Sequence, residues 1–393
     1  MILFLHSRYR TTGGEERAVE DLAWLAREHL GEEVEVLERD SALLGRARAA
    51  AGLLRGGLAP DDVGAAVRRT GARVVHAHNL TPTLGWRALA AARAAGARVV
   101  LHLHNYRLVC AVGTCVDSRG EDCTRCQGRD TLPGLRLNCR GTGPEAAAYA
   151  LALAAWQQRL AGAADVIVVP STAAHARLRE LRAPLPAPVY VVGSVVRDVA
   201  AAARPPRPDG FALVASRLAR EKGVEVAVDA SLRAGIPLVV CGDGPRAPAL
   251  RGHALAAGAR LAAAGTDPDA LGAGDVLLAG RVDGAALAAL RARAGVAVVP
   301  TRAAETFGLA AVEAMAAGLP VAASAMGALA ELGPGDGVAL VAPGDAGALA
   351  GAMAAQRADP AAGALALAAA QRLASPGAVA PRLAAAYAAA TGA

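Results

Sequence analysis

The chain has 393 residues, of which 54% are hydrophobic and 19% are charged, and its net charge is +6. A chain this long and apolar can bury large cores, which excludes an intrinsically disordered or strongly charged solvating protein. Aromatic residues make up 3% of the sequence, too few to provide stacking platforms for nucleic acid, so no nucleic-acid partner is expected. No apolar run is long enough to predict a membrane-spanning helix.

Short runs rich in β-branched residues alternate with alanine-rich stretches, which is typical of βαβ units and predicts parallel sheets. The opening residues place apolar side chains before the charges, opposite to a secretory signal, and predict a strand and a cytoplasmic location. In the first half we expect strands at residues 2–5, 34–37, 74–77, 99–103, 166–169 and 189–192. The clearest helices there are expected at residues 15–28, 83–95, 145–160 and 172–181.

A proline-rich stretch without periodicity at residues 197–210 predicts a linker, with a domain boundary near residue 205. The alternation then restarts, with strands expected at residues 211–215, 237–241, 276–279, 296–299, 321–323 and 339–341. We therefore predict two doubly wound α/β domains facing an interdomain cleft, because ligands of such sheets bind beyond the carboxyl ends of the strands. The predicted domains are residues 1–200 and 205–375, followed by a C-terminal helix at 376–393 that is clearest at 381–390.

Residues 300–324 follow an apolar strand and predict a phosphate site at the start of a helix. Thr306 is expected to cap the helix, so that the backbone amides of Phe307, Gly308 and Leu309 lie in its first turn and face an anion. Glu305 and Glu313 bracket this turn. Carboxylates beside an anion are useful when they accept hydrogen bonds from sugar hydroxyls, which is the role we expect over the alternative of a solvated surface helix.

Arg217 and Lys222 follow another expected strand and, with Gly223 behind them, fit a pyrophosphate clamp. Lys222 is the single lysine among the 41 basic residues. A compact ammonium is poorly replaced by arginine at a phosphate, although surface charges without a role are the alternative. Gly13 and Gly14 follow the first strand and let the backbone approach a ligand, which alone is a weak signal.

Several motifs resemble those of the retaining glycosyltransferases of family 4, which have the GT-B fold. In the second half these are ETFGLAAVEAMAAGLPV at 305–321, SRLAREKG at 216–223, CGDGP at 241–245 and AGRV at 279–282. In the first half GGEE at 13–16, VVHAHN at 74–79 and LHNYRLVC at 103–110 resemble the family's amino-terminal domain in the same order. The resemblance therefore covers nearly the whole chain.

The resemblance implies transfer of a sugar, typically a hexose, from a nucleoside diphosphate sugar to an acceptor hydroxyl, with retention and without a catalytic metal. By the family pattern Arg217 and Lys222 hold the diphosphate and the Phe307, Gly308 and Leu309 amides bind the β-phosphate or sugar. Glu313 binds the ribose, Glu305 binds the donor sugar, and His104 lies beside the donor, although core histidines are the alternative for this strip. Family habit favours a UDP- or GDP-sugar.

The acceptor is expected to be lipid-linked, in cell-envelope polysaccharide or glycolipid assembly. Residues 51–200 hold 18 basic and 10 acidic side chains, an excess that favours peripheral contact with an anionic surface at the inner membrane face. Three alternatives stay open at this point. They are glycosylation of a small soluble natural product, a nucleotide-sugar epimerase of similar architecture, and a binding protein without turnover.

Five of the six cysteines cluster in a loop-like, glycine-rich insertion at about residues 106–143. Cys123 and Cys126 form a C-x-x-C pair, and Cys110 and Cys139 flank it at symmetric twelve-residue gaps. This spacing resembles a four-thiolate zinc knuckle, so these four are the candidate structural zinc ligands in preference to Cys115. Free thiols and disulfides are the alternatives, and Cys241 is expected to be a core residue.

Overall fold

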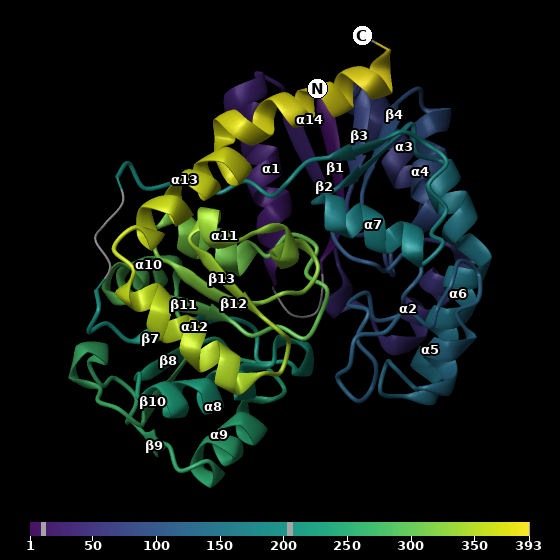
Figure 1. The fold of residues 1–393 in the computed structure, drawn as a ribbon. Helices are drawn as coiled ribbons and strands as arrows, with labels where there is room; N and C mark the ends of the chain where they lie inside the picture. The colour runs from purple at the N-terminus through teal and green to yellow at the C-terminus, as the bar shows by residue number, and fades with distance from the viewer. Residues whose placement is uncertain (9–12, 203–206, 393) are drawn as a thin grey trace. The chain divides into compact units, whose positions relative to one another are not determined.

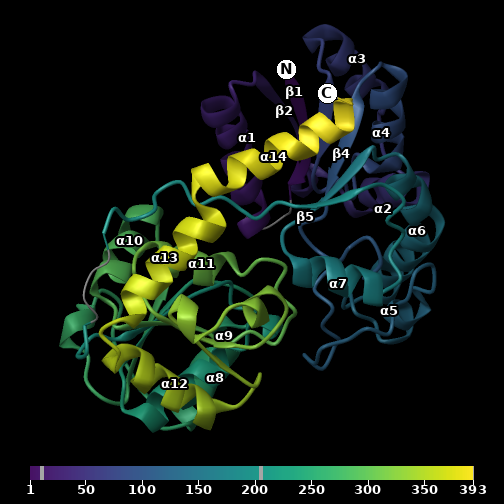
Figure 2. The same cartoon turned by 45° about the horizontal axis from the view of Figure 1, so that its top comes forward.

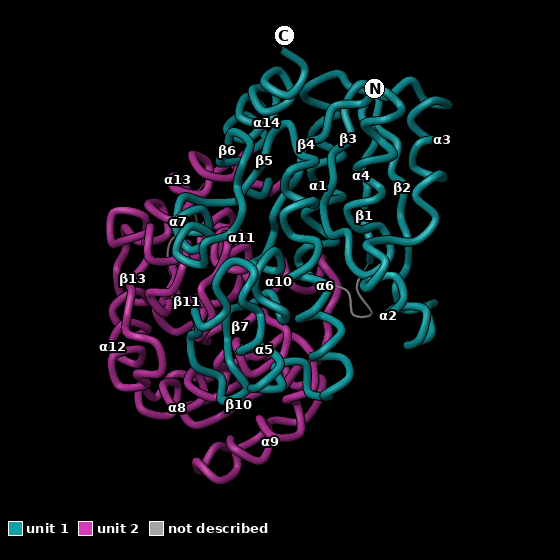
Figure 3. Tube along the Cα trace, turned by 90° about the vertical axis from the view of Figure 1, so that its right-hand side faces the viewer, with its two compact units in different colours: residues 1–195, 376–393 teal, residues 196–375 magenta. Residues whose placement is uncertain are grey.

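The computed structural model describes residues 1–8, 13–202 and 207–392, which form two compact units (Figure 3). Unit 1 comprises Met1–Val195 and Pro376–Ala393, and unit 2 comprises Val196–Ser375. The expected boundary near residue 205 lies outside the described residues. In the described part of the chain, no helix is long and apolar enough to cross a membrane.

Unit 1 is built on a parallel six-stranded sheet with the order β2-β1-β3-β4-β5-β6 (Figure 1). Its strands are β1 (Ile2–Arg8), β2 (Val34–Asp40), β3 (Val74–Ala77), β4 (Arg98–His102), β5 (Val166–Val169) and β6 (Val189–Val191). Its helices are α1 (Gly14–Leu30), α2 (Arg46–Arg55), α3 (Asp61–Thr70), α4 (Gly85–Ala94), α5 (Leu132–Arg136), α6 (Gly143–Gly162), α7 (Thr172–Glu180) and α14 (Pro376–Thr391).

Alternation along the strands decides which helix covers which face of this sheet. Ile2, Phe4, Val74 and Val100 point to one face, because successive side chains of a strand point in opposite directions. They pack there against apolar residues of α1 and α14, which run beside each other in Figure 2. The face is therefore completed by a helix that lies far away in the sequence.

Unit 2 is built on a parallel seven-stranded sheet with the order β13-β12-β11-β7-β8-β10-β9. Its strands are β7 (Ala212–Ala215), β8 (Leu238–Cys241), β9 (Arg260–Leu261), β10 (Asp275–Gly280), β11 (Val296–Val299), β12 (Val321–Ser324) and β13 (Val338–Val341). Its helices are α8 (Val224–Ala234), α9 (Ala247–Ala256), α10 (Gly284–Arg293), α11 (Leu309–Ala316), α12 (Ala346–Ala358) and α13 (Ala362–Ala374).

Two separate cores cover the two faces of the second sheet. Leu213 and Val239 pack with residues of α11 and α13, whereas the alternating Val214 and Val240 pack with residues of α8, α9 and α12. The prediction of doubly wound α/β halves is confirmed by this arrangement. Cys241, expected to be a core residue, is 3% exposed within the first of these cores.

The predicted elements differ from the observed ones mainly at their ends. The helices α2 and α3, the five-residue helix α5 within the expected loop-like insertion, and the two-residue strand β9 were not predicted. The C-terminal helix begins at Pro376 and contains Pro381, where the sequence had suggested its clear part to begin. Proline lacks the N–H that a helix interior needs and is best tolerated in the first turn. For this reason the sequence favoured a helix that begins at Pro381.

Candidate active site

Two loops of unit 2 meet where adjacent parallel strands end. β7 and β11 are neighbours, so the loops that follow them leave the same edge of the sheet. The first loop carries Lys222 at the end of a short 3-10 helix, Arg220–Lys222. The second begins at Pro300 and carries Glu305. The sheet thus brings together residues that lie more than 80 positions apart.

Lys222 and Glu305 form an ion pair with 2.6 Å between Nζ and Oε1. Both side chains remain partly accessible, at 29% and 17%. The supporting loops are joined by hydrogen bonds, since the Arg302 amide donates to the Glu221 carbonyl at 2.8 Å and the Thr301 hydroxyl donates to the same oxygen at 3.1 Å. The pair is therefore held on a fixed backbone and is open to a ligand.

Gly223 permits the close approach of these two loops. Its φ is 59°, and a Cβ at this position would lie 2.3 Å from the Pro300 carbonyl oxygen. A side chain would therefore both strain the backbone and push the loops apart. Gly223 also ends the 3-10 helix that presents Lys222.

The start of α11 differs from the prediction. Gly308, with a φ of 79°, is the residue before the helix, and the helix begins at Leu309. Thr306 is therefore not the N-cap, and of the three expected amides only that of Leu309 belongs to the helix. The earlier residues are instead held by the chain after β12: the Ala328 amide donates to the Glu305 carbonyl at 2.8 Å, and Gly327 forms a parallel bridge with Glu305.

Glu313 is buried on α11, at 9% exposure, so the alternative of a solvated surface helix is wrong for this residue. Its carboxylate accepts a hydrogen bond of 2.5 Å from Arg291 of α10. Sequence reasoning did not identify Arg291, because nothing distinguishes it from other arginines in an alanine-rich helix. Arg217 belongs to neither pair: its guanidinium binds Glu221, and its side chain is 47% exposed.

Gly13 immediately precedes α1 of unit 1, and Gly14 is the first residue of that helix. The Gly13 amide donates to Oε2 of Glu16 at 2.7 Å. A first-turn carboxylate thereby satisfies an amide that the helix itself leaves unpaired. Gly13 and Gly14 are both exposed, and the approach of a ligand to this turn stays a prediction. Residues 9–12 before it lie outside the described part.

His104 belongs to a cluster of imidazoles at the carboxyl ends of β1, β3 and β4. Its ring stacks on that of His102 with centroids 3.9 Å apart, and its Nε2 lies 2.8 Å from Nδ1 of His78. Burial lowers the pKa of His104 to about 3, and the nearby His6 adds to the shift. His104 is therefore a neutral imidazole around pH 7.

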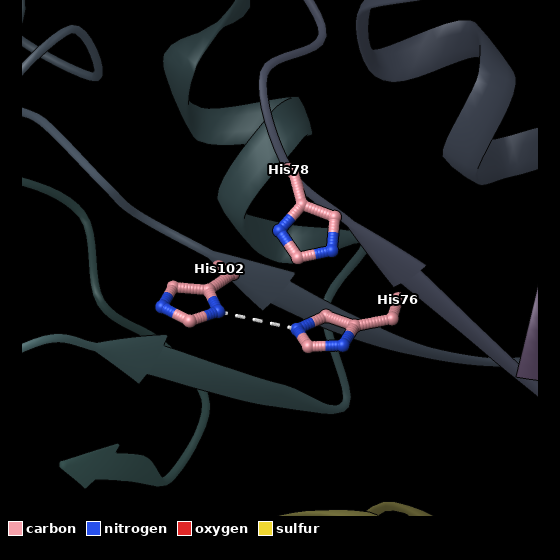
Figure 4. A group of neighbouring side chains, drawn as sticks. All are labelled: His76, His78 and His102. Atoms are coloured by element: carbon pink, nitrogen blue, oxygen red, sulfur yellow. Dashed lines mark hydrogen bonds between the residues drawn. The ribbon is translucent and has the colours of Figure 1, made fainter. Parts of the chain in front are cut away.

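The rest of this cluster continues into the core. His76 and His102 are joined by a hydrogen bond of 3.3 Å (Figure 4). Nδ1 of His76 also lies 2.9 Å from the Tyr387 hydroxyl of α14. Within the described ranges, His76, His78 and His102 form the one group of potential metal ligands whose atoms all lie within 4.8 Å of each other. The three imidazoles belong to a hydrogen-bonded network, because His102 bonds to His76, His76 to Tyr387 and His78 to His104. Nε2 of His78 is buried and has no hydrogen-bond partner among the described residues.

The four cysteines expected to bind zinc line a single cavity in the segment between β4 and α6. These are Cys110, Cys123, Cys126 and Cys139. Cys115 does not line it, and all six cysteines of the chain are unpaired thiols. The preference for these four over Cys115 agrees with the cavity lining.

Comparison with family models gives the class of the protein. Residues 11–194 match the model described as glycosyl transferase 4-like domain, and residues 210–359 match the model described as glycosyl transferases group 1. Between them the two matches cover most of the chain. The chain therefore belongs to the group 1 glycosyltransferases, as its motifs indicated.

Three solved structures with a similar fold are distant in sequence. Sucrose-phosphate synthase from Thermosynechococcus elongatus has a TM-score of 0.66 at 19% identity, with 98% of each chain covered. HepE from Anabaena, in complex with UDP, has a TM-score of 0.61 at 19% identity and the same coverage. A glycosyltransferase from Rickettsia africae ESF-5 has a TM-score of 0.66 at 15% identity, covering 99% of this chain and 98% of that one.

At such low identity these structures establish the fold alone. They confirm the predicted GT-B architecture, in which both sheets are parallel and covered by helices. Among curated proteins no match was found.

Proposed function

We propose that this glycosyltransferase moves a hexose from a nucleoside diphosphate sugar to an acceptor hydroxyl, with retention of configuration and without a catalytic metal ion. The observation that carries the proposal is the accessible Lys222 and Glu305 pair beside the start of α11. A cation and the positive end of a helix dipole together favour a diphosphate. A carboxylate beside them suits sugar hydroxyls.

In the proposed reaction the donor diphosphate binds Lys222, with Arg217 as a second cation. Negative charge grows on the leaving diphosphate as the bond to the sugar breaks, so fixed positive charge at that oxygen lowers the barrier. Lys222 now pairs with Glu305. A phosphate that takes over the ammonium would leave Glu305 oxygens available for hydrogen bonds from the donor sugar.

The other proposed contacts are those that the family pattern assigns. Glu313 accepts hydrogen bonds from the ribose, beside Arg291, which donates to its Oε2. The Gly308 and Leu309 amides, with Phe307 before them, bind the β-phosphate or sugar. His104 lies beside the donor as a neutral hydrogen-bonding group, and the leaving phosphate takes the acceptor proton on the same face.

A uridine donor is favoured over guanosine. HepE, which shares the fold, has been solved with UDP and with UDP-glucose. For the acceptor we propose a lipid-linked or membrane-surface glycan in cell-envelope assembly, because the basic excess in residues 51–200 suits an anionic surface. Flotation with liposomes that contain or lack anionic lipid tests this. We expect the protein to float with the anionic liposomes and to dissociate at high salt. A protein that does not float with them would favour a soluble natural product as acceptor.

One experiment separates transfer from its alternatives. A thermal-shift panel of nucleoside diphosphates and their sugars first identifies the donor, and the labelled donor is then incubated with the protein and followed by NMR. A transferase releases nucleoside diphosphate slowly by hydrolysis, and more rapidly with an acceptor, and its product keeps the anomeric configuration. Epimerised donor sugar, or tight binding without any release, would contradict the proposal.

A further inference from the structure

The segment between β4 and α6 is compact although it contains little regular structure. It runs from residue 103 to residue 142 and includes one helix, the five-residue α5. Tyr106, Leu108, Val109 and Val116 of this segment are nevertheless buried. A long stretch without its own secondary structure rarely stays ordered by apolar packing alone, and small irregular folds usually need a disulfide or a metal ion.

A cavity at the centre of this segment is lined by four cysteines. Its volume is about 20 Å³, enough for one small occupant. The rest of its lining is apolar or lacks a side chain: Ala111, Val116, Pro133, Gly134, Leu137 and Leu181. A water molecule needs two to four polar partners, which these residues do not offer. Soft thiolate ligands around an apolar space suit zinc. Among the residues that the structure describes, no three of the four Sγ atoms lie within 4.8 Å of one another, so the thiols would have to move closer together around a bound ion.

Backbone hydrogen bonds hold two of these cysteines at the cavity, and a third lies beside Gly134. Cys110 Sγ accepts a hydrogen bond from the Gly113 amide at 3.4 Å. The Cys139 amide donates to the Gly134 carbonyl at 3.1 Å, and a Cβ on Gly134 would lie 3.6 Å from Sγ of Cys126. Residues from both sides of the cavity are thus tied to the same short helix, α5.

The other two cysteines do not line the cavity. Cys115 is buried with a φ of 53°; its thiol contacts that of Cys110, and its carbonyl accepts a hydrogen bond of 2.8 Å from the Cys123 amide. Cys241 belongs to β8 of unit 2. No histidine of the described ranges lines the cavity, so its lining offers no imidazole ligand. The histidine network lies instead at the strand ends of unit 1.

We propose that unit 1 binds one structural Zn²⁺ ion through the thiolates of Cys110, Cys123, Cys126 and Cys139. The four thiols release their protons on binding, which gives a site with a net charge of −2. Arg125 lies between two of the ligands in the sequence, and its guanidinium hydrogen-bonds to Cys123 and, at 2.9 Å, to Asp117. This cation and the amides around Cys110 offset the negative charge. The site is independent of sugar transfer.

Metal content of the purified, full-length protein tests the proposal directly. We expect about one zinc per chain by mass spectrometry, and a Co²⁺-substituted protein with the sulfur-to-metal charge-transfer band and tetrahedral absorption of a thiolate site. Cys123→Ser and Cys126→Ser should lose the metal. The matched variants Cys115→Ser and Cys241→Ser should keep it.

A second measurement on the unmodified protein covers the case in which the ligand variants fail to fold. A mercurial reagent titrated into native protein should release zinc in step with thiol modification, and denatured protein should contain six reactive thiols. Protein without zinc, whether its cysteines are free or disulfide-bonded, would overturn the proposal. So would zinc that survives loss of Cys123 but not loss of Cys115, or a cobalt spectrum typical of nitrogen ligands.

Discussion

Lys222 is the residue on which the proposed chemistry most depends. Its ammonium approaches one carboxylate oxygen at 2.6 Å while remaining 29% exposed. Lys222→Ala should lower kcat by about 10²- to 10³-fold, because a fixed charge that meets the leaving diphosphate is lost from the transition state. Lys222→Arg should recover part of the rate, since a planar fork replaces a compact charge. Steady-state kinetics with saturating donor measure both.

Arg251→Ala is the control for general charge effects, because this arginine is exposed on α9. It should leave kcat unchanged. Full activity of Lys222→Ala would show that the diphosphate clamp is misplaced. An arginine variant as active as the parent would instead refute only the argument from geometry.

Arg291 is the cation that compensates the charge of the buried Glu313 carboxylate. Arg291→Met should destabilise unit 2 by about 3 to 5 kcal/mol, because removal of one partner leaves Glu313 as an uncompensated buried charge. Arg260→Met removes an exposed partner of Asp275 and should cost at most about 1 kcal/mol. Urea unfolding of the two variants measures the difference. Equal losses would mean that Glu313 is better solvated than its 9% exposure indicates.

The buried imidazoles make the stability of unit 1 sensitive to acid. Burial lowers the pKa of His76 and of His104 to about 3, and holds that of His78 and His102 well below 6.5. The unfolded chain therefore binds more protons than the folded chain below pH 6.5. The neutral histidines therefore make their full contribution to the unfolding free energy above pH 6.5. As the pH falls below 6.5, each histidine that stays neutral in the folded chain lowers the unfolding free energy by about 1.4 kcal/mol per pH unit.

Replacement of one imidazole tests this pH dependence. Between pH 6 and pH 4, His102→Gln should reduce the slope of the unfolding free energy against pH by about 1.4 kcal/mol per pH unit, which corresponds to one proton. Leu255→Gln, which changes no titratable group at a position that is 56% exposed, should leave the slope unchanged. Denaturant titrations at a series of pH values give the slopes. Identical slopes for all three proteins would indicate that the histidines are protonated in the folded state.

At the scale of elements, the strands were the most predictable feature. β3, β5 and β11 begin and end at the predicted residues, because short β-branched runs bounded by turns allow few alternatives. The helices α2, α3 and α5 were missed because each is short and contains a glycine, which lowers helix propensity. β9 has two residues and no pattern to detect.

The candidate site was predictable where it depends on topology. Glu305 and Lys222 each follow a strand, and neighbouring parallel strands bring such residues together. The start of α11 and the role of Arg291 were not predictable, because both depend on contacts with distant segments. Gly327 holds the backbone of Glu305 before the helix begins, and Arg291 reaches Glu313 from another helix.

The joint between the two active-site loops depends on one glycine. Gly223→Ala should lower activity by roughly 10²-fold, because a Cβ 2.3 Å from the Pro300 carbonyl displaces the loop that carries Lys222. Gly235→Ala is a matched control, with a φ of 64° and its nearest neighbour 4.0 Å away. It should cost about 1 kcal/mol of stability and no activity. Comparable activity of the two variants would argue against a rigid joint.

At the scale of the whole molecule, α14 packs on the sheet of unit 1, although all of unit 2 lies between that sheet and α14 in the sequence. Leu383→Ala should destabilise unit 1 by about 2 to 5 kcal/mol, because the side chain is fully buried beside Ile2 and Phe4. Leu255→Ala is the same change at a position that is 56% exposed, and should have little effect. Thermal unfolding followed by circular dichroism measures both. Similar melting curves would mean that α14 contributes little to the core.

The position of α14 also sets an order of assembly during synthesis. The strands of unit 1 leave the ribosome first, but Tyr387 and Leu383, which complete that core, follow only after all of unit 2. Until then the apolar face formed by Ile2, Phe4 and Val74 lacks half of its cover. Unit 2 has no such dependence and can fold as soon as its own residues have emerged. The half of the chain that is made first is therefore expected to be the half that finishes folding last, and the one that most needs chaperone protection while it waits.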